Sequence, residues 1–522
     1  MTIPEEGTHH GALRDLARRR GADPCLLWRE EAITFAELNA RSDAFGAALQ
    51  QLGIAGPDSV ALMMGNRPEF LYAWFAVSKL GAVLVPVNTA HRGPILRHML
   101  SIARCRAAVV EASYLPQVLG ELESLPHLAT IIVLGGEPPP LPDGREGYRF
   151  EDLLARGVPL ESPPVWPKDP AIIMFTSGTT GPSKGALKSQ NEGYQTARMA
   201  AESMDYGPAD CLYVALPLFH GLAQVMGVLA ALTSGARVLL VERFSASTFW
   251  EDIRRYGCTA ALYVGTMISV LMKAERRAED AENALRRMYG AGAPSSLWEE
   301  FERRFGVTLV EGYGMTEVGI VCLSLPGARK PGTCGKVQPT YDVKLVDEEG
   351  RTVPDGTPGE LLVRPRLPNF FMLEYVGMPE KTVEAWRDLW FHTGDTLVRD
   401  EEGYYRFKDR KKEAIRRRGE NISSFEVEQI VNRVPSVLES AAVGVPSDLG
   451  EEDVLVCVVP RPGHTINPEQ LHRHCSESMA HFMVPRYIRV VERLPKTPTE
   501  RVEKYRLKAE GRTADTWDAA AS

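Results

Sequence analysis

The chain has 522 residues, which is too long for one hydrophobic core, so two or more domains are expected. Its apolar content of 44% and charged content of 25% are those of an ordinary globular protein. The net charge of −8 argues against a nucleic-acid partner or an anionic membrane surface, since both need a basic face, and eight cysteines without a CxxC pair predict reduced thiols in the cytoplasm.

The first part of the chain alternates between predicted strands and helices. The apolar runs Ser59–Gly65 and Ala82–Asn88 flank an expected helix over Asn66–Gly81. Two further apolar runs follow, at Ala107–Ala112 and Thr130–Gly135. Because strands and helices alternate at this spacing, the sequence predicts a parallel, doubly wound sheet.

A loop rich in glycine and hydroxyl residues follows the next predicted strand, Ala171–Met174. The stretch Phe175–Gly185 reads FTSGTTGPSKG and carries five hydroxyl residues, three glycines and Lys184. Glycines let backbone N–H groups approach a phosphate, hydroxyls donate to it and lysine supplies a charge. The spacing is not that of a P-loop, GxxxxGK[ST]. The loop therefore predicts phosphate binding of another kind, with a surface turn as the alternative for the loop taken alone.

Three later segments place small residues or a histidine at the ends of predicted strands. They are Leu212–Gly221 (LYVALPLFHG), Arg286–Pro294 (RRMYGAGAP) and Val307–Glu317 (VTLVEGYGMTE). Ligands of open α/β sheets collect at the carboxyl ends of the strands, so these segments should converge on one crevice. The most apolar region, Cys211–Val241, is interrupted by polar residues, so no membrane span is expected.

The pattern changes towards the C-terminus. Alternating strands and tight turns over 340–408 predict an antiparallel subdomain, and the charged segment Asp409–Asn421 is the expected domain boundary. Residues 422–508 are expected to form a compact α/β unit. The predicted organisation is an N-terminal domain at 1–408, a hinge at 409–412, a C-terminal lid domain at 413–510 and a disordered tail at 511–522.

Eight motifs along the chain are similar to a known family. They are FTSGTTGPSKG, LPLFHG, GAGAP, EGYGMTE, KPGTCGK, GEL, FHTGD and DRKK. In this order they resemble the adenylate-forming (ANL) superfamily of acyl-CoA synthetases, luciferases and peptide-synthetase adenylation domains. The likeness runs from Thr34 to about Lys508. The segment Arg243–Trp250 and the C-terminal half are most similar to carnitine/crotonobetaine-type and medium-chain acyl-CoA ligases.

The resemblance implies an α/β fold with a large N-terminal domain of doubly wound, mostly parallel sheets, a β-rich subdomain and a small mobile C-terminal α/β domain. It implies an enzyme that uses ATP and Mg²⁺ to convert a carboxylic acid to an acyl-adenylate, and then transfers the acyl group to coenzyme A with release of AMP. The sequence does not identify the acid.

The same resemblance implies a nucleotide site. The ATP phosphates would be bound by Thr176, Ser177, Gly178, Thr179, Thr180 and Lys184. The adenine and the α-phosphate would be flanked by Gly292, Ala293, Pro294, Gly312, Tyr313, Gly314, Met315 and Thr316. The ribose hydroxyls would be bound by Asp395, a carboxylate with the acceptor capacity a diol needs, with Phe407 and Arg410 beside it. Glu317 would hold Mg²⁺, a hard cation suited to carboxylate and phosphate oxygens.

Acyl and coenzyme A sites are implied in the same way. His220 matches an aromatic gate between the acyl pocket and the pantetheine tunnel, although a histidine in an apolar stretch is more often a core residue. The acyl pocket would include His220, Gly221, Gly265, Tyr313 and Gly314. Coenzyme A would contact His220, Arg418 and Gly419, because a glycine lets pantetheine pass close to the backbone. The residues matched to catalytic roles are Lys412 at the hinge, Arg501, His220 and Thr316.

One departure from the family concerns the adenylation lysine. The family signature is close to PKTPTGKxxK, whereas this chain reads PKTPTERVEK at Pro495–Lys504. Glu500 replaces the glycine, and Arg501 replaces the lysine that bridges the substrate carboxylate to the α-phosphate. Arginine keeps the charge but is longer and planar, and Glu500 adds negative charge beside anions. The alternatives are that Arg501 adapts or that Lys504 shifts into the site.

We therefore expect thioester formation to be intact and adenylation to be weakened or lost, with the adenylate supplied by a separate partner enzyme. A complete two-step, ATP-dependent ligase is the first alternative. A ligase that loads a carrier protein and a non-catalytic acyl-adenylate binder are the others. Carboxylate-dependent ATP–pyrophosphate exchange reports the first step, and acyl-adenylate supplied with coenzyme A reports the second.

Overall fold

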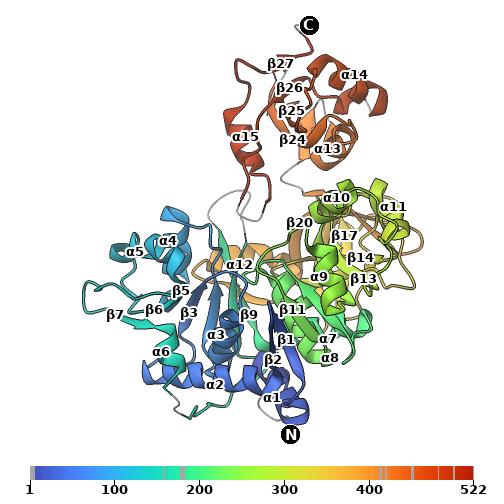
Figure 1. Cartoon of the computed structure of the whole chain (residues 1–522). Helices are drawn as coiled ribbons and strands as arrows, with labels where there is room; N and C mark the ends of the chain where they lie inside the picture. The colour runs from blue at the N-terminus through green and yellow to red at the C-terminus, as the bar shows by residue number, and fades with distance from the viewer. Residues whose placement is uncertain are drawn as a thin grey trace. The chain divides into compact units, whose positions relative to one another are not determined.

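The structure is a computed structural model that describes residues 6–156, 159–176, 183–410, 414–417, 420–447, 452–479, 481–497 and 500–520. Its internal contacts divide the chain into two compact units. Among the described residues, the first contains the chain up to Asp342 together with Val363–Trp390, and the second contains Val343–Leu362 and the chain from Phe391 onward. Figure 1 labels the elements along the chain.

The first unit contains an eight-stranded sheet that is mostly parallel. Its order is β19 (Met372–Tyr375), β9 (Lys184–Ser189), β8 (Pro170–Thr176), β4 (Val83–Pro86), β3 (Ser59–Met63), β5 (Cys105–Glu111), β6 (Thr130–Leu134) and β7 (Glu146–Arg149). The strands from β8 to β7 pair in parallel, whereas β9 pairs antiparallel with both β8 and β19. The four apolar runs predicted as parallel strands are therefore confirmed as β3, β4, β5 and β6.

A second, nine-stranded sheet carries the later motifs. Its order is β16 (Lys336–Val337), β15 (Gly319–Leu323), β14 (Thr308–Met315), β13 (Arg287–Ala291), β12 (Ala260–Val264), β10 (Cys211–Val214), β11 (Arg237–Leu240), β1 (Pro24–Trp28) and β2 (Glu31–Thr34). The central strands are parallel, and both ends of the sheet turn antiparallel.

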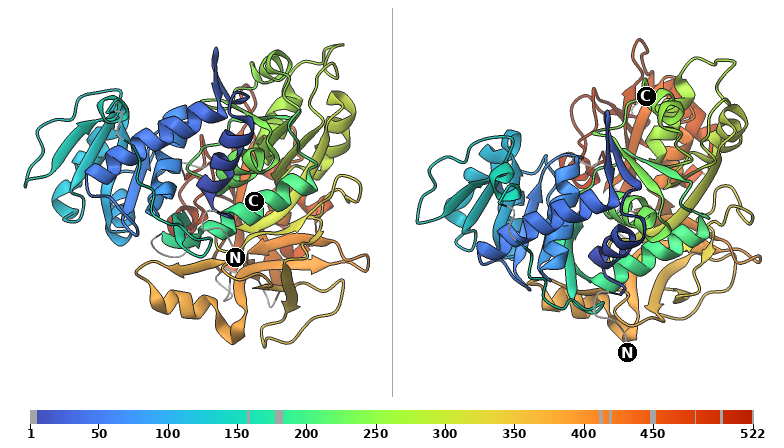
Figure 2. Two further views of the ribbon diagram at one scale, coloured as in Figure 1. Left: turned by 90° about the horizontal axis from the view of Figure 1, so that it is seen from below. Right: turned by 60° about the horizontal axis from the view of Figure 1, so that its bottom comes forward.

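Helices cover these sheets. They are α1 (His9–Arg20), α2 (Phe35–Gln51), α3 (Pro68–Lys79), α4 (Gly93–Ile102), α5 (Leu115–Leu119), α6 (Phe150–Leu154), α7 (Gln190–Ser203), a π-helix (Leu222–Leu229), α8 (Ala230–Ser234), α9 (Phe249–Tyr256), α10 (Gly265–Lys273), α11 (Ser295–Phe305) and α12 (Pro379–Ala385). Helix α2 starts with a capping box in which Thr34 and Glu37 satisfy each other's backbone N–H groups, and α3 starts with Pro68. Figure 2 shows α1 beside α2 and α7, which it contacts.

The second unit is built on two small sheets and a hairpin. One sheet, most of whose residues belong to this unit, has the order β17 (Tyr341–Val346), β18 (Gly359–Pro365), β20 (Phe391–Arg399) and β21 (Tyr405–Arg410). The hairpin joins β22 (Ala414–Arg417) and β23 (Glu420–Ser423). The other sheet has the order β24 (Val437–Pro446), β25 (Glu452–Pro460), β26 (Tyr487–Val490) and β27 (Trp517–Asp518). Its helices are α13 (Ser424–Val431), α14 (Pro468–Ser478) and α15 (Lys504–Glu510).

The end of the chain differs from the expected disordered tail. Trp517 and Asp518 form β27, which pairs antiparallel with β26. Arg486 donates to Asp518 and to buried Asp453, and Arg417 lies 2.9 Å from the same Asp453. This network of opposite charges holds the last strand to the sheet, a contact between distant residues that local composition does not reveal. The predicted boundary and hinge at 409–412 stay predictions, because residues 411–413 lie outside the described ranges.

All eight cysteines lie in the described part of the chain and are free thiols. Seven are buried, and Cys334 is half-buried. Burial raises the pKa of most of these thiols, for example that of Cys105 to about 12, so they remain neutral at ordinary pH.

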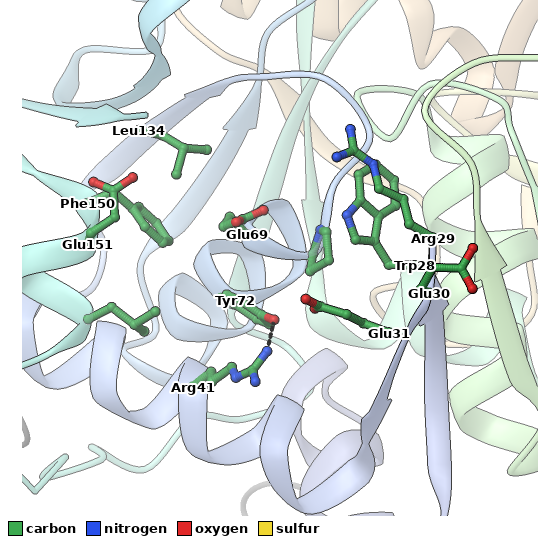
Figure 3. Close-up of a pocket in the computed structure, with 12 residues that line it drawn as sticks. Trp28, Arg29, Glu30, Glu31, Arg41, Glu69, Tyr72, Leu134, Phe150 and Glu151 are labelled. Carbon is green, nitrogen blue, oxygen red and sulfur yellow. Dashed lines mark hydrogen bonds between the residues drawn. The ribbon is translucent and has the colours of Figure 1, made fainter. Parts of the chain in front are cut away.

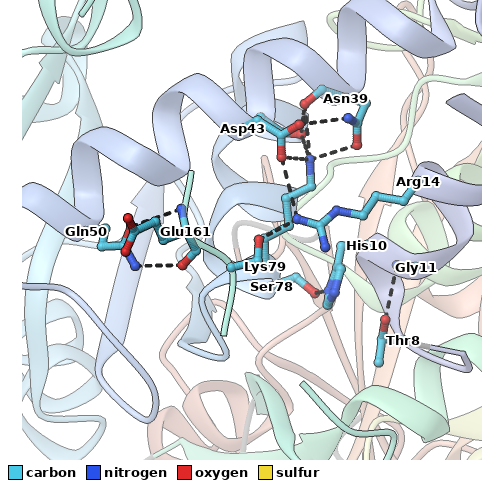
Figure 4. A network of polar contacts seen from close by, with 12 residues as sticks. Thr8, His10, Gly11, Arg14, Asn39, Asp43, Gln50, Ser78, Lys79 and Glu161 are labelled. Carbon is cyan, nitrogen blue, oxygen red and sulfur yellow. Dashed lines mark hydrogen bonds and ion pairs between the residues drawn. The ribbon is translucent and has the colours of Figure 1, made fainter. Parts of the chain in front are cut away.

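A buried polar network ties the first three helices together (Figure 4). The ammonium group of Lys79 is fully buried and lies 2.8 Å from the carboxylate of Asp43, and it also donates to Ser42 and Asn39. A buried charge is tolerated when it is paired and hydrogen-bonded in this way. Nearby, the Nδ1 atom of His10 lies 2.9 Å from the hydroxyl of Ser78.

Two histidines in this region predict acid sensitivity. His9 and His10 are buried; burial lowers the pKa of His9 to about 3 and that of His10 well below its usual range. The folded state keeps them neutral, whereas the unfolded chain binds protons near pH 6.5, so the free energy of unfolding should fall as pH drops below about 6.5. We expect a loss of about 1 kcal/mol per histidine between pH 6.5 and 5.5, measured by urea unfolding.

The matched variants are His9→Gln and His464→Gln. The first removes one titrating group and should make the unfolding free energy less dependent on pH, whereas the second alters an exposed histidine and should leave the pH profile unchanged. Equal profiles for wild type and His9→Gln would show that His9 contributes nothing to the acid sensitivity.

Candidate active site

The glycine-rich loop connects two antiparallel strands. Strand β8 ends at Thr176 and β9 begins at Lys184, and these two residues are paired in the register. The predicted phosphate-binding residues from Ser177 to Thr180 lie outside the described residues. Lys184 is held at the base of the loop, with its ammonium group 4.1 Å from the centre of the Tyr375 ring, a cation–π contact.

The carboxylate predicted to hold Mg²⁺ shares this tyrosine. Glu317 is buried, with 3% of its surface exposed, and its Oε1 atom accepts a hydrogen bond of 2.8 Å from the hydroxyl of Tyr375. Its backbone carbonyl accepts from the N–H of Met372, which binds the turn to β19. Lys184 and Glu317, predicted from motifs 133 residues apart, are therefore joined through one ring. Burial and the nearby carboxylate raise the pKa of Tyr375 far above its usual range, so its hydroxyl remains a donor.

The EGYGMTE motif forms the end of β14 and a tight turn into β15. Tyr313 is buried, and Thr316 lies half-buried in the turn next to Glu317. Gly314 lies against the backbone of β15, and a Cβ atom at this position would be 2.3 Å from the carbonyl oxygen of Gly319. The glycine is thus required for the antiparallel pairing that positions Thr316.

The turn at Gly292–Pro294 is supported by a residue that the sequence reasoning missed. The Oε1 atom of Glu311 accepts a hydrogen bond of 2.6 Å from the backbone N–H of Ala293. Gly265, assigned to the acyl pocket, also approaches this turn, and a Cβ atom there would lie 1.9 Å from the carbonyl oxygen of Gly292. An acidic residue at the end of an otherwise apolar strand was the available signal for Glu311.

Glu311 predicts a second pH effect, of opposite sign to that of the histidines. Burial raises its pKa to about 7, although the hydrogen bond from Ala293 opposes the shift. The folded state keeps the proton that the unfolded chain loses near pH 4.5, so the free energy of unfolding should fall as pH rises from about 4.5 to 7. Glu311→Gln should remove this dependence on pH. At pH 8 its free energy of unfolding, measured with urea, should exceed that of the wild type by at most about 3 kcal/mol.

Exposed Glu348 provides the matched control for this comparison. Glu348→Gln removes the same charge at the surface and should leave the difference in stability between pH 5 and pH 8 as it is in the wild type. If Glu311→Gln shows the wild-type pH dependence, the carboxyl group of Glu311 is ionised in the folded protein.

His220 follows a loop at the carboxyl end of β10 and precedes the π-helix Leu222–Leu229, a rare element often found at functional sites. Its ring packs against Phe219 at 4.7 Å between centroids, and its Nε2 atom is buried without a hydrogen-bond partner among the described residues. Burial, with a smaller effect from His91, lowers the pKa of His220 to about 4, so the ring is neutral at ordinary pH. Next to it, Gly221 packs against Met174 of β8.

The residues predicted for the ribose belong to the second unit. Asp395 lies on β20 with 4% of its surface exposed, and its backbone N–H donates to the hydroxyl of Thr393. The register pairs Asp395 with Arg410 and Leu397 with Phe407, so β20 and β21 bring the three predicted residues to adjacent positions. The side chain of Arg410 lies outside the described residues, as do Lys412, Arg418 and Gly419.

Arg501 lies in a tight turn of the second unit. The backbone N–H of Arg501 donates to the hydroxyl oxygen of Thr497. The backbone carbonyl of Arg501 accepts from the backbone N–H of Thr497. Glu500 has a φ angle of +60°, in the left-handed region that favours glycine. The turn thus adopts at residue 500 a conformation suited to the glycine of the family signature. Lys504 is held elsewhere, 3.0 Å from Glu428 and hydrogen-bonded to Ser424, which argues against its replacing Arg501.

A separate pocket of about 520 Å³ lies in the first unit and contains none of the predicted site residues (Figure 3). Aromatic and charged side chains line it, among them Trp28, Arg41, Tyr72, Phe150 and Glu151. Over the described parts of the chain, no group of three or more His, Cys, Asp and Glu side chains forms a metal cage. None of the helices there is long and apolar enough to cross a membrane.

Comparisons with known proteins agree with this arrangement. The sequence matches the AMP-binding enzyme family over residues 13–375 and the AMP-binding enzyme C-terminal domain over residues 426–501. The crotonobetaine/carnitine–CoA ligase of Salmonella arizonae is 32% identical over 493 residues, which cover 91% of this chain and 93% of the relative. That of Citrobacter koseri is 30% identical, over 95% of this chain and 97% of the relative.

Solved structures agree as well. The anthranilate CoA ligase AuaEII in complex with anthranoyl-AMP is 27% identical, with a TM-score of 0.87 over 96% of this chain and 97% of that one. A benzoate CoA ligase from Burkholderia xenovorans is 25% identical, with a TM-score of 0.84 over 96% of this chain and 99% of that one. The chain therefore belongs to the AMP-binding enzyme family, within the adenylate-forming superfamily of acyl-CoA ligases.

Proposed function

We propose that this protein is a complete, two-step AMP-forming acyl-CoA ligase. In the first step a carboxylate oxygen of the acid attacks the α-phosphorus of ATP, and pyrophosphate leaves. In the second step the thiolate of coenzyme A attacks the acyl carbonyl carbon, and AMP leaves. The observation that carries the proposal is the joining of Lys184 and buried Glu317 through Tyr375, which gathers a cation and a carboxylate at the base of the hydroxyl-rich loop.

The donor set at Glu317 fits Mg²⁺. This ion is usually bound by one or two carboxylates together with substrate phosphates and water, so one buried carboxylate is sufficient on the protein side. Tyr375 occupies only the Oε1 atom of Glu317 among the hydrogen bonds found there. When bound, the ion would neutralise charge on the phosphates of ATP. Lys184 would bind the same phosphates, and Asp395 would accept from the ribose hydroxyls.

Arg501 is proposed as the cation that brings the acid and the α-phosphate together. Two anions must be held along the line of attack, and a positioned cation does so by charge and geometry. The left-handed conformation at Glu500 supports this role, because the turn that presents Arg501 has the shape a glycine would favour. The extensive similarity to proteins named CoA ligases, one of them solved with an acyl-adenylate, also favours two steps over one.

The names of the relatives suggest which acids to test first. The relatives carry names of ligases for crotonobetaine, carnitine, anthranilate and benzoate, and these acids form the first panel to test. ATP–pyrophosphate exchange that depends on one of them would establish the first step, and release of AMP with coenzyme A would establish the whole reaction. If exchange is absent for every acid while supplied acyl-adenylates still yield acyl-CoA, the enzyme performs only the second step and needs an adenylating partner.

A further inference from the structure

One buried amide connects the two large sheets of the first unit. Asn66 follows β3 of the eight-stranded sheet and precedes α3, and only 4% of its surface is exposed. Its side chain reaches the carboxyl ends of β10 and β11 in the nine-stranded sheet. A buried amide needs hydrogen-bond partners for its donors and its acceptor. If the groups bound to it move away, the amide is left unsatisfied, which costs free energy, so these groups are held in place.

Every contact of this amide is with backbone. The Nδ2 group donates to the carbonyl of Leu216 at 3.0 Å and to that of Val241 at 3.0 Å, and the Oδ1 atom accepts from the N–H of Leu218 at 2.8 Å. Both N–H bonds and the oxygen of the side-chain amide of Asn66 are thus engaged in hydrogen bonds. The result is a clamp on the segment that begins the LPLFHG motif.

A second amide completes the clamp from the opposite direction. Gln224, in the π-helix, is buried, and its Nε2 group donates to the carbonyl of Leu218 at 2.6 Å. Leu218 therefore has its N–H bound by Asn66 and its C=O bound by Gln224. Both amides of the clamp act on one residue whose own side chain is buried.

The clamped residue lies two positions before His220. The ring of His220 is neutral, and its Nε2 atom is buried without a hydrogen-bond partner among the described residues. Because no such bond fixes the Nε2 atom, the backbone position of His220 decides what the ring can contact. Its backbone N–H donates to Pro217, which lies between the two clamped residues Leu216 and Leu218. A displacement of Leu218 would therefore be transmitted to the ring of His220, two residues further along the chain.

We propose that Asn66, with Gln224, is a positioning residue that fixes the Leu216–His220 loop and so sets how the acyl group and coenzyme A are received at His220. The inference rests on the proposed function for the meaning of His220, but the clamp itself involves no nucleotide-binding residue. It predicts that loss of the amide affects the acid and coenzyme A far more than ATP, since Lys184, Glu317 and the turn at Gly292 are held by other contacts.

The test compares Asn66→Leu with Asn39→Leu. Asn39 is another amide with side-chain partners in this unit: it binds Asp43 and Lys79 and does not touch the loop, so its removal costs stability without disturbing the clamp. For Asn66→Leu we expect the KM values for the acid and coenzyme A to rise about tenfold or more, with the KM for ATP changed by less than about threefold. Asn39→Leu should leave all three KM values near those of the wild type.

Two further variants sharpen the result. Asn66→Asp keeps the acceptor for Leu218 but loses both donors and places charge against two carbonyls, so its effect should have the same pattern as that of Asn66→Leu. Gln224→Leu should also show this pattern, and the double variant Asn66→Leu/Gln224→Leu should lose less than the product of the two single effects, because both amides hold Leu218.

Hydrogen exchange separates this inference from the proposed function, because it needs no activity. In Asn66→Leu the backbone N–H groups of Leu216 and of residues 218–221 should exchange at least about tenfold faster than in wild type, whereas in Asn39→Leu they should not. Faster exchange in a protein that is inactive with every acid would support the clamp and overturn the proposed function. Unchanged exchange would overturn the clamp whether or not the enzyme is active. In an active enzyme, KM values that shift equally for all three substrates would overturn it as well.

Discussion

Replacing Arg501 with alanine is expected to abolish most of the first half-reaction and to spare the second. Loss of a positioned group that stabilises charge in the transition state commonly lowers the rate by about 10²–10³. We expect a fall of this size in acid-dependent ATP–pyrophosphate exchange for Arg501→Ala. Conversion of supplied acyl-adenylate and coenzyme A to thioester should stay within about twofold of wild type, because residue 501 is assigned to adenylation alone.

Lysine variants provide the controls. Arg501→Lys should retain exchange, since it keeps the cation. Lys504→Ala should retain it too, because Lys504 is occupied by Glu428 and Ser424. Glu500→Gly removes a side chain from a left-handed position and should raise stability by about 1 kcal/mol. Brisk exchange in Arg501→Ala, or its loss in Lys504→Ala, would assign the role to another cation.

The second large effect is expected at Glu317. Glu317→Gln keeps the size of the side chain and a group that can accept from Tyr375, but it removes the charge proposed to hold Mg²⁺. We expect exchange to fall by about 10²–10³ and the Mg²⁺ concentration for half-maximal activity to rise, measured by titrating the metal at saturating ATP. The thioester step from supplied adenylate should change little, because no pyrophosphate is then displaced.

Tyr375→Phe is the graded control for this prediction. It removes one hydrogen bond to Glu317 while the ring beneath Lys184 remains, so we expect a loss of about 1 kcal/mol, or roughly fivefold in exchange. If Glu317→Gln keeps wild-type exchange and an unchanged Mg²⁺ dependence, the carboxylate does not hold the metal.

The parallel core could be predicted from sequence because its strands are continuous apolar runs. Strands β3 and β6 are buried at every position, and such runs stand out against their flanking turns. The π-helix at Leu222–Leu229 lies in the apolar region Cys211–Val241, where the sequence was used to exclude a membrane span and not to distinguish types of helix, so this type of helix was not predicted.

The candidate site was predictable where a motif is local and missed where it is assembled from distant segments. Lys184 and Glu317 are recognised by their neighbours in sequence, but Tyr375, which joins them, comes from a strand 58 residues after Glu317. Asn66 was expected only as the start of a helix, since its partners lie 150 and more residues away. Hydrogen bonds across such distances depend on the completed fold, and no pattern in the neighbouring residues encodes them.

The burial of seven of the eight cysteines has a practical consequence for testing whether the two units move. A single Cys334→Ser replacement would leave a surface with no readily alkylated sulfur, since the remaining thiols are shielded. A cysteine introduced on the exposed face of each unit could then carry a fluorescent dye selectively. Energy transfer between the dyes, recorded molecule by molecule as ATP and then coenzyme A are added, would reveal whether the lid swivels between the two chemical steps.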